Sequence, residues 1–397
     1  MSVAFLKDQC LGRLLAGHPW IYASDLLRIE KPPVDGGEIT IRNAKGGYIG
    51  SGLYNSQSQI PIRVFTRSKE HLDDQFFSRQ LRAAIDYRKN LHGGTLPGAC
   101  RLVWSEADGL PGLIVDRYGE TLVAQFLTLP LDQRKELIAS LLAAELKPVR
   151  IVERSDVPSR TLEGLPLSKG ILSGLRPVPS TARMGNIQVE IDFLEGQKTG
   201  SYLDQIENQQ TVARFAKGRQ TLDCFTYHGG FALHAAKAGA KAVEAWDISE
   251  PAIVCCRRNA ALNRLSGIEW KTVNVFDELR NRQKNQARFD LIILDPPSFT
   301  KSRNRLHEAL RGYKEIHLRA LQLLRPGGLL ASFCCSHHVD AESFRATILD
   351  AAFDARRILR LRHTFQQAPD HPILPAIPET EYLKGFLFEV IHAGLPA

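Results

Sequence analysis

The chain has 397 residues, of which 44% are hydrophobic and 24% are charged. This is the composition of a globular protein, and the length suggests two or three domains. No run of about 18 apolar residues occurs, which excludes a membrane-spanning helix and a membrane partner. The first eight residues lack a basic stretch followed by an apolar one, so we expect a cytoplasmic protein rather than a secreted one.

The net charge of +8 favours an anionic partner such as nucleic acid, although a basic enzyme without such a partner is equally common. The seven cysteines are odd in number and irregularly spaced, which fits a reducing compartment. Two adjacent pairs, Cys255-Cys256 and Cys334-Cys335, cannot form the Cys-x-x-Cys knuckle of a zinc site. We therefore predict no metal.

The first 70 residues predict a small β-barrel. Short β-type segments occur at Glu38–Ile41, Tyr48–Tyr54 and Ile60–Phe65. Turn signals, Asp35-Gly-Gly and Lys45-Gly-Gly, precede the first two of them.

Residues 71–184 predict an α+β domain. Apolar residues recur at helical spacing between Leu72 and Lys89. Further along, the patterns predict a hairpin at 112–119 and 121–126, a helix at Asp132–Leu146 and a strand at Val149–Glu153. Proline and glycine between Gly164 and Pro179 predict a linker or an exposed loop.

From about Gly185 strands and helices alternate, which predicts a parallel sheet with helices on both faces. The candidate strands are Thr221–Phe225, Val243–Asp247, Glu269–Val273, Leu291–Asp295 and Leu329–Phe333. The fold class is thus α/β, with three domains expected at 1–70, 71–184 and 185–397.

Ligands of such sheets bind beyond the carboxyl ends of the strands. Gly229 and Gly230 allow a tight turn there, and the pattern differs from the Gly-x-Gly-x-x-Gly of nicotinamide enzymes. Asp247 is placed to accept hydrogen bonds from ribose hydroxyls, and a side-chain oxygen at Asn274 could read an adenine edge. Asp295 opens an Asp-Pro-Pro-Ser-Phe loop. Each residue alone could be a helix cap or an ordinary loop residue, but their order at successive strand ends favours a cofactor site.

With these motifs the chain resembles the class I S-adenosylmethionine (SAM) methyltransferases, and more narrowly the bacterial ribosomal RNA large subunit methyltransferase I family. The resemblance covers nearly the whole length and is carried by Gly17-His-Pro-Trp-Ile-Tyr, Glu106–Gly119, Glu153-Arg-Ser-Asp, Lys198–Gln205, Asp295-Pro-Pro and Arg311-Gly-Tyr-Lys. It implies a PUA-type RNA-binding barrel, a Rossmann-like catalytic sheet, SAM as cofactor and large-subunit ribosomal RNA as partner. We predict these SAM-binding residues: Gln205, Asp223, Phe225, Thr226, Tyr227, Gly229, Gly230, Asp247, Ser249, Asn274, Val275, Phe276 and Asp295.

The fifth strand ends in Phe333-Cys-Cys-Ser-His-His, which suggests covalent catalysis at carbon 5 of a cytosine. That carbon is a weak nucleophile until a thiolate adds at carbon 6. The resemblance places the nucleophile at Cys335, whereas Cys334 should point to the opposite face of the strand. Both could instead be buried apolar residues.

Asp295 is the second predicted catalytic residue, because a protonated carboxyl there could donate a hydrogen bond to cytosine N3. Related cytosine methyltransferases have a further cysteine where Ser298 stands. The family tends to have small residues at His337 and His338, and whether either acts as a base stays open. Asn274 and Ile206 also depart from the family pattern.

For RNA binding we single out Arg13, His18 and Trp20 in the barrel, and Arg303 and Arg305 after the catalytic loop. Trp20 could instead pack the barrel core. Two other functions stay open: methyl transfer to a guanine nitrogen, which needs no cysteine, and a non-catalytic SAM-binding ribosome-assembly factor. The sequence does not distinguish a monomer from a homodimer.

Overall fold

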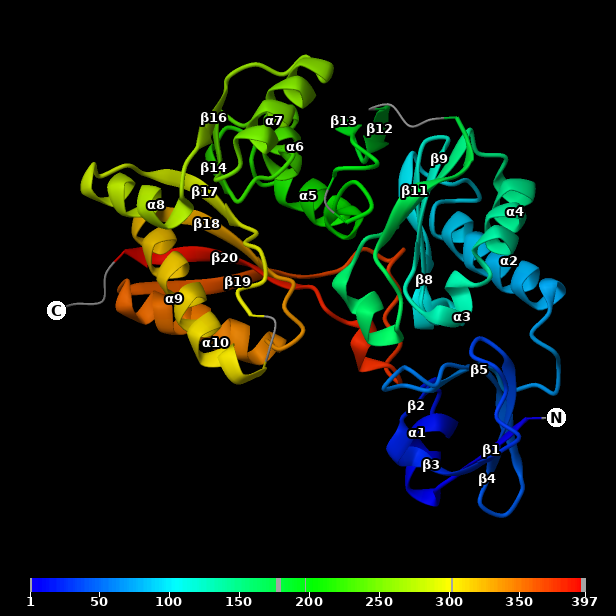
Figure 1. Cartoon of the computed structure of the whole chain (residues 1–397). Helices are drawn as coiled ribbons and strands as arrows, with labels where there is room; N and C mark the ends of the chain where they lie inside the picture. Colours follow the sequence, from blue (N-terminus) through cyan, green and yellow to red (C-terminus); the bar gives the residue numbers. More distant parts are fainter. Residues whose placement is uncertain (1, 176–179, 197, 301–302, 394–397) are drawn as a thin grey trace. The chain divides into compact units, whose positions relative to one another are not determined.

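The computed structural model describes residues 2–175, 180–196, 198–300 and 303–393, which form two compact units (Figure 1). The first unit contains Met1–Arg183, Ile191–Leu203 and Pro369–Thr380. The second contains Met184–Glu190, Asp204–Ala368 and Glu381–Ala397. Each unit therefore combines segments that are distant in the sequence, and the division into three domains at 70 and 184 stays a prediction. No helix among the described residues is long and apolar enough to cross a membrane.

The predicted β-barrel region is a six-stranded mixed sheet with the strand order β2-β6-β5-β4-β1-β3. Its elements are β1 (Val3–Leu6), η1 (Asp8–Cys10), α1 (Leu11–Leu15), β2 (Trp20–Ile21), η2 (Ala23–Asp25), β3 (Leu26–Glu30), β4 (Glu38–Asn43), β5 (Tyr48–Tyr54) and β6 (Ile62–Thr66). Small aliphatic side chains from most of these strands fill one core. The three strands predicted by sequence are β4 to β6. The other three have only two to five residues, too few for a clear alternation of apolar and polar residues.

The next part of the first unit is a five-stranded sheet with the order β11-β10-β9-β8-β7. Its elements are α2 (Asp74–Leu91), β7 (Ala99–Trp104), η3 (Ser105–Asp108), β8 (Leu113–Tyr118), β9 (Thr121–Phe126), α3 (Leu129–Asp132), α4 (Lys135–Leu146), β10 (Arg150–Ser155), η4 (Pro158–Glu163) and β11 (Ser168–Gly174). Helix α2 begins as expected, after Asp73, whose carboxylate accepts a hydrogen bond from the Phe76 N–H. Phe76 and Phe77 contact Phe65 of the first sheet, so the two sheets share a core.

The helix expected at 132–146 is confirmed as α4, which begins at Lys135 because the short α3 ends at Asp132. One prediction for this region is wrong. The loop expected at 164–179 contains β11, which pairs with β10 at the edge of the sheet. All side chains of β11 are at least partly exposed, so the strand lacks the apolar pattern from which a strand is predicted.

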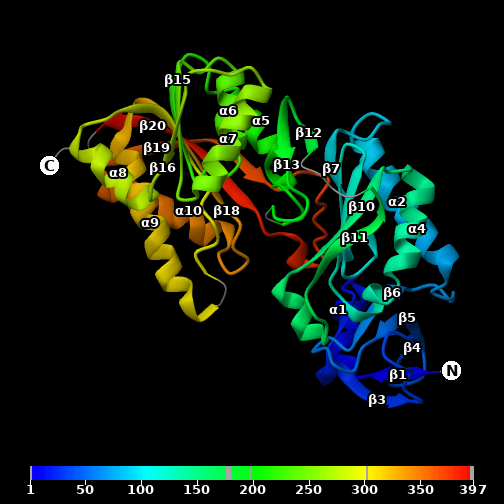
Figure 2. The ribbon, with the colours of Figure 1, turned by 45° about the horizontal axis from the view of Figure 1, so that its top comes forward.

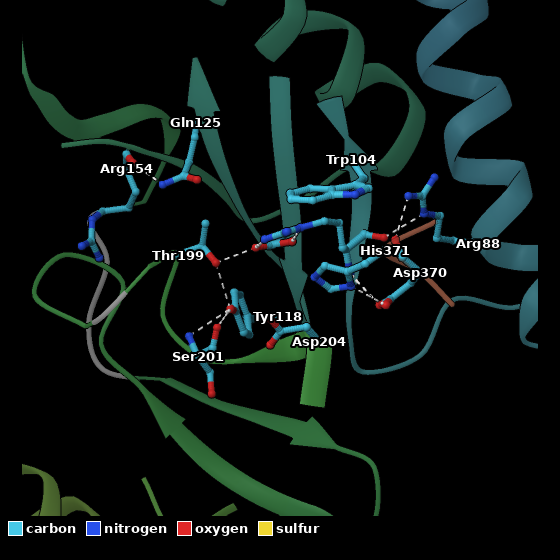
Figure 3. Close-up of polar contacts among 12 residues, drawn as sticks. Arg88, Trp104, Tyr118, Gln125, Arg154, Thr199, Ser201, Asp204, Asp370 and His371 are labelled. Atoms are coloured by element: carbon cyan, nitrogen blue, oxygen red, sulfur yellow. Dashed lines mark hydrogen bonds and ion pairs between the residues drawn. The ribbon is translucent and has the colours of Figure 1, made fainter. Parts of the chain in front are cut away.

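A buried polar network connects two of the motif stretches within the first unit (Figure 3). Arg101 donates two hydrogen bonds of 2.8 Å each to the carboxylate of Asp116, and both side chains are buried. The Thr199 hydroxyl donates to the same carboxylate and lies 3.1 Å from the Tyr118 hydroxyl. Tyr118 in turn accepts a hydrogen bond from the Ser201 N–H. The Asp-Arg-Tyr and Lys-Thr-Gly-Ser motifs therefore meet in a structural network.

The same network holds the late segment 369–380 in the first unit (Figure 3). Arg88 is fully buried and donates to the Asp108 carboxylate and to the Asp370 carbonyl oxygen. Asp370 accepts a hydrogen bond from the backbone N–H of Arg101, and its carboxylate lies 2.7 Å from the His371 ring nitrogen. The His371 ring packs against Trp104, with the ring centroids 5.7 Å apart.

The second unit contains a seven-stranded sheet with the order β16-β15-β14-β17-β18-β20-β19. Its elements are η5 (Leu203–Gln205), α5 (Ile206–Ala213), β14 (Gln220–Cys224), α6 (Gly230–Lys237), β15 (Ala242–Asp247), α7 (Glu250–Leu262), β16 (Ile268–Thr272), α8 (Val275–Lys284), β17 (Phe289–Leu294), η6 (Arg303–Arg305), α9 (Leu306–Leu323), β18 (Leu324–Cys334), α10 (Ala341–Asp354), β19 (Arg357–Gln366) and β20 (Lys384–Ala393). A short β12 (Ser180–Met184) pairs with β13 (Ile187–Ile191), and η7 (Pro378–Thr380) lies in the late segment of the first unit.

The five predicted strands are β14 to β18, which pair in parallel as expected. Helices α5, α6 and α7 group on one face of the sheet and α8, α9 and α10 on the other (Figure 2). The expected α/β fold class is therefore confirmed. Strands β19 and β20, which were not predicted, extend the sheet in antiparallel fashion beyond β18.

Candidate active site

The carboxyl ends of four parallel strands meet at one edge of the sheet. Cys224, at the end of β14, is in register with Trp246 of β15 and Leu294 of β17, and Asp247 is in register with Thr272 of β16. The chain leaves β14 toward β15 on one side and reaches β17 on the other, so the order of the strands switches at β14. Ligands bind at such a switch point, which identifies this edge as the candidate site.

The loop after β14 has a strained backbone. Phe225 and Tyr227 have φ angles of 63° and 50°, in the left-handed region that L-residues rarely adopt. Gly229, with φ 85°, is the N-cap of α6. A Cβ atom at Gly229 would lie 3.0 Å from the Trp270 ring, and one at Gly230 would lie 2.3 Å from Nε2 of the Gln209 side chain. The positive φ of Gly229 and the nearby Trp270 ring thus favour glycine at this position, whereas a side chain at Gly230 would require the end of the Gln209 side chain to move.

Asp223 is buried below the loop. Its Oδ2 accepts hydrogen bonds from the Thr226 hydroxyl, at 2.5 Å, and from the Ala232 N–H, at 3.0 Å. Its Oδ1 is buried without a hydrogen-bond partner among the described residues. Burial raises the pKa of Asp223 to about 7, even though both hydrogen bonds favour the ionised form. A cation bound nearby would therefore favour loss of the proton from this carboxyl group at neutral pH.

Asp247 is held by the backbone on both of its oxygens. Oδ2 accepts a hydrogen bond from the Tyr227 N–H and Oδ1 from the Ser249 N–H, each at 2.9 Å. The Ser249 hydroxyl caps α7 by accepting from the Ala252 N–H. The carboxylate is half-buried and each oxygen keeps a second lone pair, so it can accept further hydrogen bonds from a ligand.

Asn274 caps helix α8. Its Oδ1 accepts hydrogen bonds from the backbone N–H groups of Phe276 and Asp277. The side-chain oxygen that we expected to read adenine is therefore occupied by the helix, and the amide nitrogen is the more available group. The ring of Phe276 lies between those of Phe225 and Phe299, at centroid distances of 6.5 and 5.9 Å, and together they supply an apolar surface beside the loops.

This donor and acceptor pattern fits SAM. SAM carries an ammonium group and two ribose hydroxyls, which are hydrogen-bond donors, and an adenine ring, which favours apolar and aromatic surfaces. The unpartnered Asp223 Oδ1 and the open lone pairs of Asp247 are acceptors, and the phenylalanine rings form the apolar surface. Within the described ranges no group of three or more His, Cys, Asp or Glu side chains is arranged to hold a metal ion.

Asp295 lies at the end of β17 and is oriented by two amide side chains. The Asn208 amide donates to the Gln205 Oε1 at 2.7 Å, and the Gln205 Nε2 donates to the Asp295 Oδ2 at 3.1 Å. The buried Gln205, predicted to bind SAM, thus contacts the predicted catalytic carboxyl. The loop after β17 also contacts the loop after β18, because the Ser336 hydroxyl donates to the Thr300 carbonyl oxygen at 3.4 Å.

The two cysteines at the end of β18 have different surroundings. Cys334 is fully buried, its thiol lies 3.3 Å from the Tyr313 hydroxyl, and burial raises its pKa. Cys335 is partly exposed, whereas the other six cysteines are all buried. His337 and His338 are exposed, and the His337 ring lies 5.7 Å from that of Tyr382. Of the seven thiols, Cys335 is therefore the one that a reactant can reach.

The predicted RNA-binding residues of the first unit make contacts within the protein. Arg13 forms an ion pair of 2.6 Å with Asp25 and donates to the Trp20 carbonyl oxygen. The buried His18 lies 3.2 Å from the Glu379 carboxylate. The indole of Trp20 donates to the carboxylate of Glu106 at 2.9 Å. Contact of Arg13, His18 and Trp20 with RNA stays a prediction.

The predicted basic segment 301–305 follows the loop that begins with Asp295. Lys301, Ser302 and the side chain of Arg303 lie outside the described residues. The Arg305 side chain is 72% exposed and pairs with Glu308 at 2.9 Å, so it can reach a ligand in solvent.

Two residues of the candidate site, Gln209 and Lys384, were not predicted from the sequence. Gln209 packs against Gly230, and its Oε1 is buried without a partner among the described residues. Lys384 begins β20 and contacts the loop after Cys335. The helical pattern of residues 206–213 could have predicted that Gln209 faces this site. The position of Lys384 beside the Cys335 loop follows only from the pairing of β20 with β18.

Comparison with known proteins agrees with this geometry. A family model of PUA-like domains matches residues 5–67, and one of S-adenosylmethionine-dependent methyltransferases matches residues 184–389. The ribosomal RNA large subunit methyltransferase I of Shewanella amazonensis is 40% identical over 377 residues, which is 94% of this chain and 95% of that protein. The enzyme of the same name from Aliivibrio fischeri is 39% identical, over 97% of this chain and 98% of that protein.

Solved structures show the same fold. A protein from Streptococcus mutans, assigned as a SAM-dependent methyltransferase, superposes with a TM-score of 0.83 at 20% identity over 98% of this chain and all of that chain. SMU.776, also assigned as a methyltransferase and solved with S-adenosylhomocysteine (SAH), superposes with a TM-score of 0.84 at 20% identity, with the same coverage.

Proposed function

The chain belongs to the ribosomal RNA large subunit methyltransferase I family, and from this premise we propose that it transfers the methyl group of SAM to carbon 5 of a cytosine in large-subunit ribosomal RNA. SAM is the cofactor of its methyltransferase domain. The ribosomal RNA substrate is proposed from the names of the relatives, and the cytosine from the chemistry of the site.

The observation that carries the choice of cytosine is the partly exposed Cys335 at the end of β18. A reaction at a guanine nitrogen requires no thiol, whereas one at cytosine carbon 5 requires a nucleophile beside the base. The loop of Cys335 contacts the loop that begins with Asp295 through Ser336 and Thr300. The proposed nucleophile and the proposed carboxyl therefore lie on neighbouring loops.

The Cys335 thiolate would add to carbon 6, forming a C–S bond and converting the ring to an enamine that is nucleophilic at carbon 5. Asp295, if protonated, would donate a hydrogen bond to N3 and stabilise the added electrons. Bound SAM supplies an electrophilic methyl group to carbon 5. A base would then remove the carbon 5 proton, and the electron pair would expel the thiolate. Cys335 is regenerated, and the products are 5-methylcytosine and SAH.

The target base must be unpaired or flipped out of a helix, because carbon 6 is inaccessible to a thiolate inside a stacked duplex. The partial exposure of Cys335 suits such a base. The PUA-like domain at 5–67 is the proposed docking module for RNA, and the exposed Arg305 is a proposed phosphate contact.

Methyl transfer from labelled SAM to undermethylated ribosomal RNA tests the proposal, if the modified nucleoside is identified for wild type, Cys335→Ala and Cys334→Ala. We expect labelled 5-methylcytosine with the wild type and Cys334→Ala, and a loss of at least 1,000-fold with Cys335→Ala, since the covalent route is then closed. Methylguanine formed equally by Cys335→Ala would replace the proposal with the guanine reaction. Tight SAM binding without turnover on any ribosomal RNA would indicate a non-catalytic assembly factor.

A further inference from the structure

Lys384 connects the last strands of the sheet to the loop that follows Cys335. It is the first residue of β20 and is in register with Cys334 of β18. Its Nζ donates hydrogen bonds to the carbonyl oxygens of Ser336, at 2.7 Å, and Val339, at 2.6 Å. These two residues lie on either side of the turn after Cys335. One ammonium group thus holds both ends of the turn.

The two hydrogen bonds described for the Lys384 Nζ go to neutral carbonyl groups, and neither goes to a carboxylate. Burial lowers the pKa of Lys384, because desolvation disfavours the ammonium form. Four neighbouring groups oppose this effect when they are ionised: Cys334 and Cys335, followed by Glu381 and Asp340. A thiolate formed beside Lys384 would therefore stabilise the ammonium, and the ammonium would stabilise the thiolate.

Only one of these two cysteines is suited to become a thiolate. Burial raises the pKa of Cys334, although its hydrogen bond with Tyr313 and the positive charge of Lys384 lower it in part. Cys335 is partly exposed, so a thiolate there loses less hydration than one at the buried Cys334. Because the Lys384 Nζ donates to the carbonyl oxygen of Ser336, the residue that follows Cys335, it brings a positive charge close to a thiolate formed at Cys335.

We propose that Lys384 is a positioning residue for the methyl-transfer reaction: its ammonium group holds the 336–339 turn and stabilises the thiolate of Cys335. This inference rests on the proposed function, since it concerns the same nucleophile. The third N–H of the ammonium, which neither carbonyl uses, is available to interact with a negatively charged sulfur.

Alkylation of Cys335 by iodoacetamide as a function of pH tests this proposal on the full chain without RNA or SAM. The thiolate is the reacting species, so the pH profile reports its population, and peptide mass spectrometry separates Cys335 from the buried cysteines. With Lys384→Met we expect alkylation at pH 7 to fall about tenfold and its midpoint to move up by about one pH unit. Lys384→Arg, which keeps the charge, should restore most of the reactivity.

Lys314→Met serves as the matched control, because Lys314 is a solvent-exposed lysine of the same unit that pairs with Asp354. Thermal unfolding of all variants shows whether they fold. A Lys384→Met profile that coincides with those of the wild type and Lys314→Met would overturn the proposal. Equal losses in Lys384→Met and Lys384→Arg would also overturn it, because charge would then be irrelevant.

The thiol measurement stays informative if the proposed function fails. Methylguanine formed by both the wild type and Cys335→Ala would refute the proposed function but would leave the alkylation profile of Cys335 unchanged. If the function holds, the ascending limb of the pH profile of kcat should shift upward in Lys384→Met and return in Lys384→Arg, which a loss of packing alone would not produce.

Discussion

Replacement of Gly229 by alanine should weaken SAM binding through the turn between β14 and α6. Gly229 has φ 85°, and an alanine in this left-handed region costs about 1–2 kcal/mol. The new Cβ would also lie 3.0 Å from the Trp270 ring and 3.3 Å from the Cys256 sulfur, both in a buried region. Such overpacking typically costs about 1–3 kcal/mol. The sum, about 2–5 kcal/mol, can be relieved only if the turn shifts.

The matched control is Gly218→Ala. Gly218 has a similar φ of 72°, but its added Cβ would meet no atom within 4 Å, so only the backbone cost of about 1–2 kcal/mol applies. Isothermal titration with SAM and thermal unfolding should be measured for both variants. We expect Gly229→Ala to raise the Kd for SAM at least tenfold, about 1.4 kcal/mol, and Gly218→Ala to leave it within twofold. A Kd for Gly229→Ala equal to that of the wild type would refute the assignment of this turn to the cofactor.

Three further predictions concern other parts of the molecule. Burial raises the pKa of Asp223 to about 7, so its neutral form contributes stability at acidic pH that is lost as the pH rises through 7. Because cationic SAM favours the carboxylate form, the affinity of the protein for SAM should rise between pH 6 and pH 8. Asp223→Asn should flatten that rise in titrations at several pH values. Asp116→Asn should lower the free energy of unfolding of the first unit by about 3–5 kcal/mol, since the Arg101 guanidinium bonded to Asp116 would be left buried and unpaired. The control Glu30→Gln, in an exposed ion pair, should cost less than about 1 kcal/mol. Equal shifts of the two variants in urea unfolding would contradict a stabilising role of the buried Arg101–Asp116 network. Replacing Arg303 and Arg305 with alanine should weaken RNA binding and reduce its salt dependence, whereas unchanged binding at low and high salt would remove them from the interface.

The catalytic sheet could be predicted because its parallel strands are buried on both faces and read as short apolar runs. The carboxyl ends of those runs point to Asp223, Asp247 and Asp295, since the topology of a doubly wound sheet brings them to one edge. The roles of single atoms could not be predicted in this way. Asn274 illustrates the difference, because its oxygen caps α8, a local bond that competes with any ligand.

Features that depend on long-range pairing were missed. Strand β20 lies beside β18 although about 50 residues separate them in sequence, and this pairing brings Lys384 to the Cys335 turn. Contact of Arg13, His18 and Trp20 with RNA was predicted from the resemblance to the family's RNA-binding barrel. In the folded chain each has partners within the first unit that the sequence does not reveal.

The measurement that tests the central claim most directly is the reaction with ribosomal RNA containing 5-fluorocytidine in the presence of SAM. Fluorine at carbon 5 cannot leave as a proton does, so the thioether at carbon 6 cannot be eliminated once the methyl group has been transferred. The mechanism predicts a protein–RNA adduct that survives denaturation, maps to Cys335 and is absent from Cys335→Ala. Full methylation of natural RNA by an enzyme that forms no such adduct would contradict the covalent mechanism at cytosine.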